Sequence, residues 1–209
     1  MDAMQLFGFP VVFDWHVAAM TIFGILEVVS LWPYLVDIIH GETRPNKVSF
    51  VLWTMTTGIA AAAMYEEKGW SFPTIAICMT ALSMASITIL ALVGYGYVKR
   101  QKTDIASLIL GVTAIIGWQV SGEPMVAIAF AIGADVCAAI PTIEKALKEP
   151  FTEHAGAWGL ITVGYFFGAL SSKDKDVADL AMLGYLTVMC GTIFLIAYLG
   201  QKRGVTARR

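Results

Sequence analysis

The chain has 209 residues, of which 57% are hydrophobic and 14% are charged, and its formal net charge at pH 7 is −2. Soluble domains contain about 45–50% apolar and about 25% charged residues, so this chain has too few charges to cover a soluble surface. The composition excludes an ordinary soluble domain, and the lack of a basic stripe with interleaved aromatics argues against a nucleic-acid partner.

Charged residues cluster in short segments, and the stretches between them are nearly free of charge. These stretches are about 18–25 residues long, which as helices matches a hydrocarbon core of about 30 Å. Because lipid offers the backbone no hydrogen-bonding partners, each stretch should be an α-helix. The sequence therefore predicts an all-α integral membrane protein that crosses the lipid bilayer seven times, at residues 13–39, 46–65, 71–98, 104–119, 124–143, 154–170 and 177–199.

The distribution of Lys and Arg predicts the orientation of these helices. If the N-terminus is outside, 11 Lys and Arg fall in the inside loops and the C-terminal tail, and 3 fall outside. Cytoplasmic loops of membrane proteins carry an excess of positive charge. We therefore expect an outside N-terminus, a cytoplasmic C-terminus and a location in the plasma (inner) membrane.

The two parts of the chain share a spaced pattern of residues. The matched pairs are Pro33 and Pro141, Pro45 and Pro150, Trp53 and Trp158, Glu27 and Asp135, and the segments 82–88 and 186–192. Internal repeats of this kind are common in secondary transporters. The pattern predicts a first three-helix repeat (1–102), a connector helix (103–123) and a second three-helix repeat with a basic tail (124–209). A single connector helix gives both triplets the same orientation.

This three-plus-one-plus-three plan resembles the PQ-loop, MtN3 and SWEET transporter superfamily. The residues that carry the resemblance are Pro33-Tyr34, Arg44-Pro45-Asn46-Lys47-Val48-Ser49 and Trp53 in the first repeat, and Pro141-Thr142, Pro150 and Trp158 in the second. The Pro-Gln dipeptide of the superfamily is Pro-Tyr and Pro-Thr here. The resemblance implies two parallel three-helix bundles and transport of a small solute by alternating access.

The resemblance also implies positions for substrate binding or gating. A second pair of hinge prolines in the sugar-carrying members corresponds here to Trp53 and Trp158. The paired asparagines of those members correspond to Ser86 and Cys190, or else to Ser83 and Thr187. Small residues in membrane helices usually serve packing, which is the alternative interpretation of these last four.

Glu27 and Asp135 are the only acidic or basic side chains well inside a predicted span. A charged side chain at that depth costs about 2.5–3.5 kcal/mol on insertion scales, so it normally faces a polar cavity or a partner. One hypothesis is that these acids couple transport to protons or bind a cationic substrate. The alternative is a protonated acid that hydrogen-bonds to a neighbouring helix and supports packing.

Pro33 and Pro141 each free the backbone carbonyl four residues earlier, at Val29 and Cys137. Matched breaks of this kind could be hinges on which the two repeats rock. Alternatively, each proline makes an ordinary kink that ends its helix near the cytoplasmic surface. The symmetry of the two prolines favours hinges.

Trp53 and Trp158 lie a turn or two into their helices. Tryptophan concentrates at membrane interfaces, so both could be interface anchors, as we expect for Trp15, Trp32 and Trp70. Their matched positions also suit stacking on a planar substrate or gating of its path.

The leading prediction is a transporter of a small polar solute, and the alternative is a membrane receptor or sorting protein on the same fold. An enzyme is not expected, because no nucleophile with a base and no metal cluster can be placed on facing helices. A retinal protein needs a lysine in the last span, and residues 177–199 contain none. We expect no cofactor and no metal, since His16 and His154 lie near opposite faces. The expected partners are a small-molecule substrate and the bilayer, and a homo-oligomer remains open.

Overall fold

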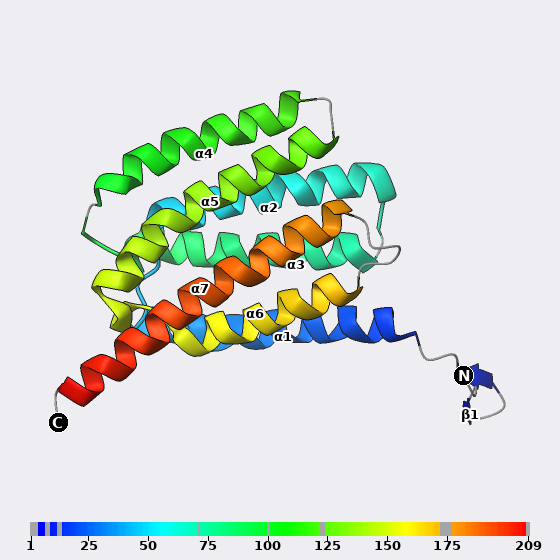
Figure 1. Ribbon diagram of the computed structural model, residues 1–209, viewed down its shortest axis with the longest axis horizontal. Coiled ribbons are helices and arrows are strands. Elements are labelled where there is room, and N and C mark those ends of the chain that lie inside the picture. Colours follow the sequence, from blue (N-terminus) through cyan, green and yellow to red (C-terminus); the bar gives the residue numbers. More distant parts are fainter. Residues whose placement is uncertain are drawn as a thin grey trace.

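The computed structural model describes residues 4–6, 9–11, 14–70, 72–99, 101–121, 124–171 and 177–207. Within these residues the chain forms seven long helices (Figure 1). They are α1 (Trp15–His40), α2 (Lys47–Lys68), α3 (Phe72–Leu90), α4 (Lys102–Val120), α5 (Pro124–Lys148), α6 (Ala155–Ser171) and α7 (Val177–Ala207). The predicted helices are present, although α5 and α7 run further along the chain than the sequence predicts.

Three short elements accompany the helices. Strands β1 (Met4–Leu6) and β2 (Phe9–Val11) pair antiparallel before α1. A π-helical turn, η1 (Ala91–Tyr95), extends α3, and a 3-10 turn, η2 (Pro150–Thr152), precedes α6. The sequence does not predict the hairpin, because three-residue strands are too short to show a two-residue period.

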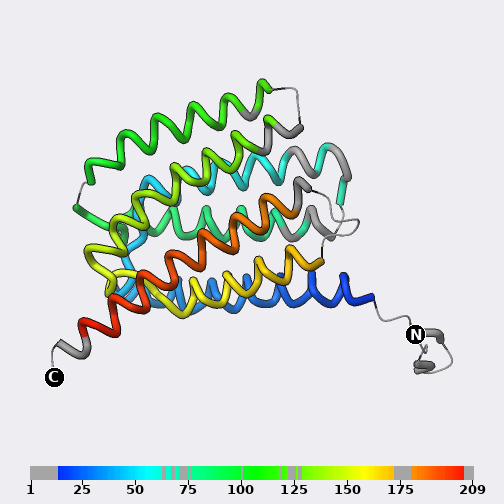
Figure 2. Tube along the Cα trace, in the orientation of Figure 1, coloured from blue at the N-terminus to red at the C-terminus, as the bar shows by residue number. Residues whose placement is uncertain are grey.

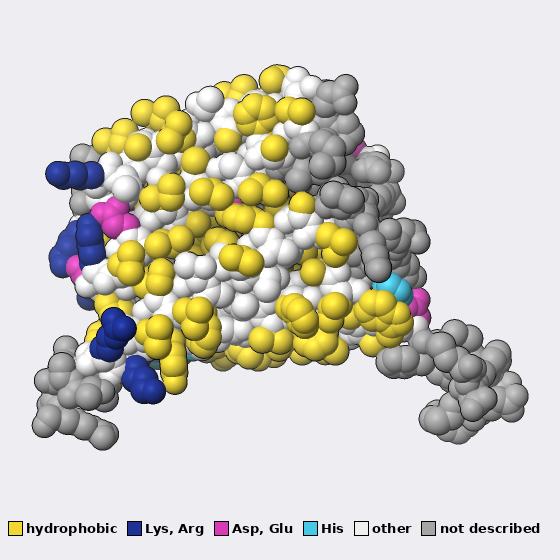
Figure 3. Space-filling view, in the orientation of Figure 1, with side chains coloured by type: hydrophobic (Ala, Val, Ile, Leu, Met, Phe, Trp, Pro, Cys, Tyr) yellow, Lys and Arg dark blue, Asp and Glu magenta, His cyan; other side chains and the backbone are white. Residues whose placement is uncertain are grey.

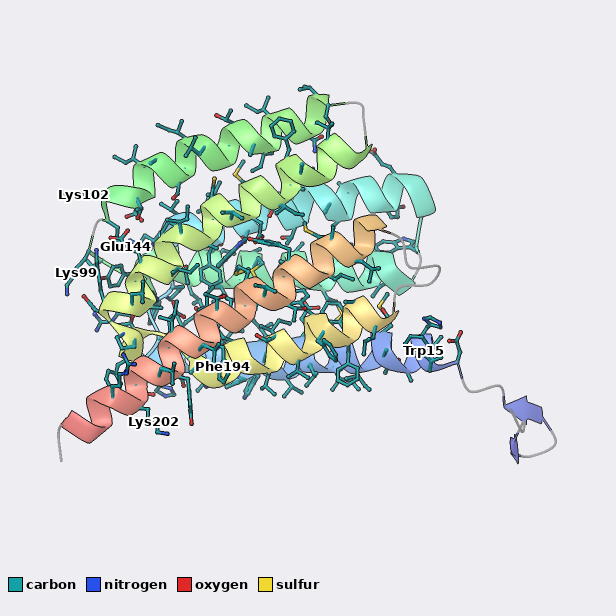
Figure 4. All side chains as sticks on the ribbon, in the orientation of Figure 1. Trp15, Lys99, Lys102, Glu144, Phe194 and Lys202 are labelled. Carbon is teal, nitrogen blue, oxygen red and sulfur yellow. The ribbon has the colours of Figure 1, made fainter. Side chains whose placement is uncertain are left out.

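The helices run up and down along a common axis (Figures 1 and 2). Helices α1, α5, α7 and the η1 turn end at one end of the bundle, where α2, α4 and α6 begin. Lys99, Lys102 and Lys202 lie at this end, and Trp15 lies at the other (Figure 4). Lys and Arg side chains also gather there on the face drawn in Figure 3. We call it the basic end.

Polar and glycine caps fix the helix boundaries that lead to the basic end. Gly41 ends α1 with a left-handed φ of 76°, a conformation that glycine adopts at low cost. After the turn, the side chain of Asn46 accepts a hydrogen bond from the Ser49 backbone N–H at 3.1 Å and starts α2. The turn between α1 and α2 is therefore defined at both of its ends.

The main helix contacts can be compared with the predicted repeat, in which α1, α2 and α3 correspond to α5, α6 and α7. Helix α1 packs on α6 and α2 packs on α5, while α3 packs on α2 and α7 packs on α6. When each helix is replaced by its counterpart, the α1–α6 contact becomes the α5–α2 contact, and the α2–α3 contact becomes the α6–α7 contact. Helix α4 packs mainly on α5 and forms one edge of the bundle (Figure 1).

The most extensive contacts of α1 are with α6 of the predicted second repeat. Helix α1 contacts α3 only slightly and packs far more extensively along α6. The reason is close approach at small residues of α6. A Cβ atom at Gly164 would lie 3.4 Å from Leu26 Cβ and 3.4 Å from Phe23 Cδ2 on α1. The two repeats are thus interlocked through α1 and α6.

The interpretation that the prolines end their helices is wrong. Helix α1 continues from Pro33 to His40, and α5 continues from Pro141 to Lys148. A proline inside a helix removes one hydrogen bond, and tertiary packing can compensate for that loss. Both prolines therefore lie inside continuous helices, at matched distances from the helix ends.

Three helical segments are long and apolar enough to cross a membrane within the described residues: Trp15–His40, Ile77–Tyr95 and Leu180–Gly204. Large apolar side chains also cover the outside of the bundle; Trp32 is 73% exposed and Leu82 is 68% exposed. The face in Figure 3 is accordingly mostly hydrophobic between its two ends. Soluble proteins rarely expose continuous apolar surface on this scale, so this surface suits lipid.

Replacing Gly164 by leucine should destabilise the protein, because the added side chain would overlap α1. Overpacking of this kind costs about 1–3 kcal/mol. Val163→Leu is the matched control, since Val163 is 46% exposed and points away from the interface. Thermal unfolding of the detergent-purified variants measures the difference. Equal melting temperatures for the two variants would show that α1 and α6 are not closely packed here.

Candidate functional site

Each of the two predicted acids is buried and bonded to a hydroxyl from the third helix of its own repeat. Glu27 on α1 is 7% exposed, and the Thr80 hydroxyl of α3 hydrogen-bonds to its carboxylate. Asp135 on α5 is also 7% exposed, and the Tyr185 hydroxyl of α7 donates to its Oδ2 at 2.9 Å. The two acids differ in one respect: Glu27 Oε1 has no hydrogen-bond partner among the described residues.

Glu27 lines a small, partly open cavity with a volume of about 60 Å³. The walls come from both repeats. Helix α1 contributes Glu27, Ser30, Leu31 and Tyr34, α2 contributes Phe50, α3 contributes Ser83, Met84 and Ile87, and α6 contributes Ala157, Trp158, Ile161 and Tyr165. Asp135 is not part of the lining, although Tyr165 interacts electrostatically with both acids. The structure therefore brings one of the two acids to the cavity and keeps the other nearby.

Four aromatic rings form a cluster on the side of the cavity toward the basic end. The ring centroids of Trp53 and Trp158 are 5.9 Å apart, so the matched tryptophans of the two repeats touch each other. Tyr34 packs edge-on against Trp158 at 6.3 Å, and Phe50 packs edge-on against Trp53 at 5.0 Å. We call Tyr34, Phe50, Trp53 and Trp158 the aromatic cluster.

Trp53 and Trp158 are buried, so the interpretation of these two residues as interface anchors is wrong. By contrast, Trp15, Trp32 and Trp70 are exposed on the outside of the bundle. A location between the repeats is compatible with the alternative roles of stacking or gating.

Beyond the aromatic cluster, the ammonium of Lys145 is completely buried at the basic end. Its Nζ lies 2.5 Å from Glu153 Oε1 and donates to the carbonyl oxygens of Arg44 at 2.5 Å and Thr152 at 3.3 Å. The ring of Tyr97 lies 5.7 Å from the same nitrogen. A buried ammonium is tolerated only when its donors are paired in this way.

Glu153 connects Lys145 to the aromatic cluster. While Oε1 faces Lys145, Oε2 accepts hydrogen bonds from Trp158 Nε1 at 2.9 Å and from the Tyr34 hydroxyl at 3.2 Å. These contacts tie α1, the end of α5 and the start of α6 together. We call Lys145, Glu153, Tyr34 and Trp158 the latch.

Polar contacts on either side of the latch also join the two repeats. The Thr142 hydroxyl of α5 donates to Ser49 Oγ of α2 at 2.8 Å, and both residues are fully buried. The Arg44 backbone N–H donates to the Thr152 carbonyl at 2.9 Å, which joins the loop before α2 to the η2 turn. Helices α1, α2, α5 and α6 therefore meet at the basic end through hydrogen bonds.

A partly exposed carboxylate completes this layer. Glu149 accepts hydrogen bonds from Lys99 and, at 3.0 Å, from the Tyr97 hydroxyl. The hydrogen bond from Lys99 lowers the pKa of Glu149 below its usual value. The loop after η1 is thereby attached to the loop between α5 and α6.

The small polar residues predicted at mid-membrane are divided between cavity, core and surface. Ser83 lines the cavity, one helical turn from Ile87. Ser86 lies on the exposed face of α3, because each residue turns the helix by about 100° and Ser86 is one residue out of phase with Ile87. Thr187 is half-buried and donates to the Leu183 carbonyl, while Cys190 is buried in the core.

The described residues contain no group of three or more His, Cys, Asp or Glu side chains arranged to hold a metal ion. His16 Nδ1 lies 3.1 Å from the Ser171 carbonyl at one end of the bundle. His154 Nε2 lies 3.6 Å from Asp37 Oδ2 at the basic end. The two histidines are thus used in separate contacts.

The latch is not evident from the sequence pattern. Lys145 is expected in a cytoplasmic loop, because the predicted span ends at residue 143. Helix α5 instead continues to Lys148 and carries Lys145 into the bundle. Tyr34 is noticed in the sequence only as part of the Pro33-Tyr34 motif. Tyr165 is not noticed at all, because the matching position of the first repeat holds no polar residue.

Comparison with known proteins returned no matching family model, no curated protein with significant similarity and no solved structure with significant similarity. The function is therefore inferred from the chemistry of the cavity and the latch.

Removing only one member of the buried Lys145–Glu153 pair should destabilise the protein strongly. Glu153→Gln leaves the ammonium without its counter-charge, which typically costs about 3–5 kcal/mol. Adding Lys145→Met should recover much of this loss, because the double variant buries no charge and the new amide oxygen at position 153 still accepts from Trp158. Denaturant or thermal unfolding in detergent measures the coupling between the two substitutions.

Lys148→Met is the control, since Lys148 is exposed and its ion pair with Glu144 at the surface should contribute about 1 kcal/mol or less. Additive effects of Glu153→Gln and Lys145→Met would contradict the latch geometry.

Proposed function

We propose that this protein is an integral membrane carrier that moves a small polar solute by alternating access, on a seven-span fold of the PQ-loop and SWEET type. The observation that carries the proposal is the cavity between the two repeats. It contains a buried carboxylate, Glu27, with one oxygen unpaired among the described residues, and it lies directly beneath the latch. In the proposed cycle, a solute reaches Glu27 from the membrane surface when one end of the bundle opens.

The contacts at the basic end suit a gate because they cross between the repeats. The Tyr34–Glu153 bond joins α1 to the start of α6, and the Ser49–Thr142 bond joins α2 to α5. Hydrogen bonds of this type can be exchanged for bonds to water when the repeats separate. A purely apolar seal would instead lose its full burial free energy on opening.

In this proposal the basic end faces the cytoplasm, because positive charge favours that side of the membrane. Pro33 and Pro141 act as hinges within α1 and α5, between the mid-membrane acids and the gate. Glu27 and Asp135 take up and release protons as the cavity changes sides. Tyr165 interacts electrostatically with both acids.

Transport can be tested in proteoliposomes loaded with a pH-sensitive dye and exposed to panels of sugars, amino acids, vitamins, nucleosides and amines. The wild type should show a solute-dependent change in internal pH, and Glu27→Gln and Asp135→Asn should reduce it to the level of empty vesicles. The reason is that an amide cannot carry a proton. Glu42→Gln, in the exposed turn after α1, is the matched control.

If no solute enters wild-type vesicles faster than empty ones, the carrier proposal is wrong. If uptake occurs and its pH response persists in both variants, the carrier stands and the proton coupling is wrong.

A further inference from the structure

The geometry of the cavity points to a specific class of substrate. We infer that the cavity binds a small organic cation, with the positive charge against Glu27 and the apolar part against Trp158 and Phe50. This inference rests on the proposed carrier function for its physiological meaning, but the binding site can be tested without transport. The cavity measures about 60 Å³ in this structure, so binding of an organic cation requires the helices around it to separate as the carrier opens.

The cavity offers acceptors and almost no free donors. Five described lining residues carry a hydroxyl or N–H group, and four of these groups already donate within the protein. The Ser30 hydroxyl donates to the Glu27 carbonyl at 2.8 Å, and the Ser83 hydroxyl donates to the Met79 carbonyl at 2.9 Å. Tyr34 and Trp158 both donate to Glu153. Among these five, only Tyr165 remains as a donor to a ligand.

The unpaired acceptor is the strongest of the polar groups in the cavity. Glu27 Oε1 has no hydrogen-bond partner in the described part of the chain, although the residue is more than nine-tenths buried. Leaving a buried acceptor unpaired costs free energy, and the cost is larger for a charged group. A ligand that donates to this oxygen removes the cost, so Oε1 selects for a donor.

The negative charge of Glu27 favours a positively charged donor over a neutral one. Glu27 is the one charged residue among the described residues that line the cavity, and no lysine or arginine faces it there. An ammonium or guanidinium ligand would neutralise the carboxylate as well as donate to it. An anion would meet both the negative charge and the lack of donors. A sugar needs donors and acceptors in similar numbers, which this lining does not supply.

The aromatic rings provide a second reason to expect a cation. Tyr34, Phe50, Trp158 and Tyr165 all line the cavity, and Tyr34 and Trp158 are held edge-to-face. Cations, and quaternary ammonium groups in particular, are attracted to the faces of such rings. The same rings accommodate the apolar part of a ligand, which fixes its orientation relative to Glu27.

Matched pairs of probes that differ in charge test the inference on purified protein in detergent. Benzylamine is compared with benzyl alcohol, and choline with its neutral isostere 3,3-dimethylbutan-1-ol; benzoate serves as the anion. Isothermal titration calorimetry at low salt should show at least one of the two cations binding about tenfold or more tightly than its neutral partner. Benzoate should not bind.

Glu27→Gln should remove this preference for the cation, whereas the surface control Glu42→Gln should leave it unchanged. Asp135→Asn should weaken cation binding less than Glu27→Gln, because Asp135 is outside the lining and is bonded to Tyr185. If Glu27→Gln does not fold, Glu27→Asp provides the test. This variant keeps the carboxylate but shortens the side chain by one methylene group. The cation should therefore bind the variant more weakly than it binds the wild type, but still more tightly than the neutral isostere binds the variant.

Equal binding of cation and isostere, or a cation preference that survives Glu27→Gln, would overturn the inference. So would the absence of saturable cation binding up to about 10 mM, which is well above the usual range of working affinities. Different results would contradict the inference and the carrier proposal. Cation binding without uptake in proteoliposomes would contradict the carrier alone, and uptake of a neutral sugar without cation binding would contradict this inference alone.

Discussion

The burial of the Lys145 ammonium is the constraint on which the rest of the site depends. Moving an isolated ion of this size from water into a low-dielectric interior costs of the order of 20 kcal/mol in the idealised limit, and several kcal/mol in real proteins. The structure meets this cost with Glu153 and with two carbonyl oxygens from Arg44 and Thr152. These acceptors belong to the loops before α2 and α6, so pairing the ammonium brings the two loops together. Because Glu153 also accepts from Tyr34 and Trp158, the same ion pair positions the rings above the cavity.

The two repeats use the same positions with different chemistry. In the register that matches Pro33 with Pro141, Asp37 on α1 corresponds to Lys145 on α5. Asp37 lies 3.6 Å from His154 near the surface, whereas Lys145 is fully buried against Glu153. The mid-membrane acids differ similarly, since Asp135 is bonded to Tyr185 and Glu27 keeps an oxygen in the cavity that is unpaired among the described residues. In the proposed carrier, the first repeat therefore supplies the binding group and the second supplies the anchor of the gate.

Sequence reasoning predicted the features that depend on hydropathy and on local signals. The helices follow from long uncharged stretches, and their boundaries from residues such as Gly41 and Asn46. Glu27 and Asp135 are evident from sequence because a charge in an apolar segment is unusual, and Trp53 and Trp158 because they recur at matched positions. The contact between the two tryptophans depends on how the repeats pack, which spacing alone does not show.

Tertiary contacts decide the remaining features. Lys145 looks like a loop residue until α5 is seen to continue to Lys148, past the predicted end of the span. Ser83 and Ser86 are the same residue type and lie three positions apart in an apolar segment. Only the orientation of α3 about its own axis places Ser83 in the cavity and Ser86 on the surface. The close packing of α1 on α6 requires Gly164 to face Phe23, which a one-dimensional pattern does not specify.

In the proposed carrier, the Lys145–Glu153 pair holds the basic end closed over the cavity. Pulsed electron paramagnetic resonance can test it with spin labels at Glu42→Cys and Lys148→Cys, which are exposed on the two repeats at that end. The background variant replaces Cys78, Cys137 and Cys190 by alanine. We expect one narrow distance distribution with the pair intact, and a broader distribution extending to longer distances after Glu153→Gln. An unchanged distribution in a folded Glu153→Gln protein would contradict the claim.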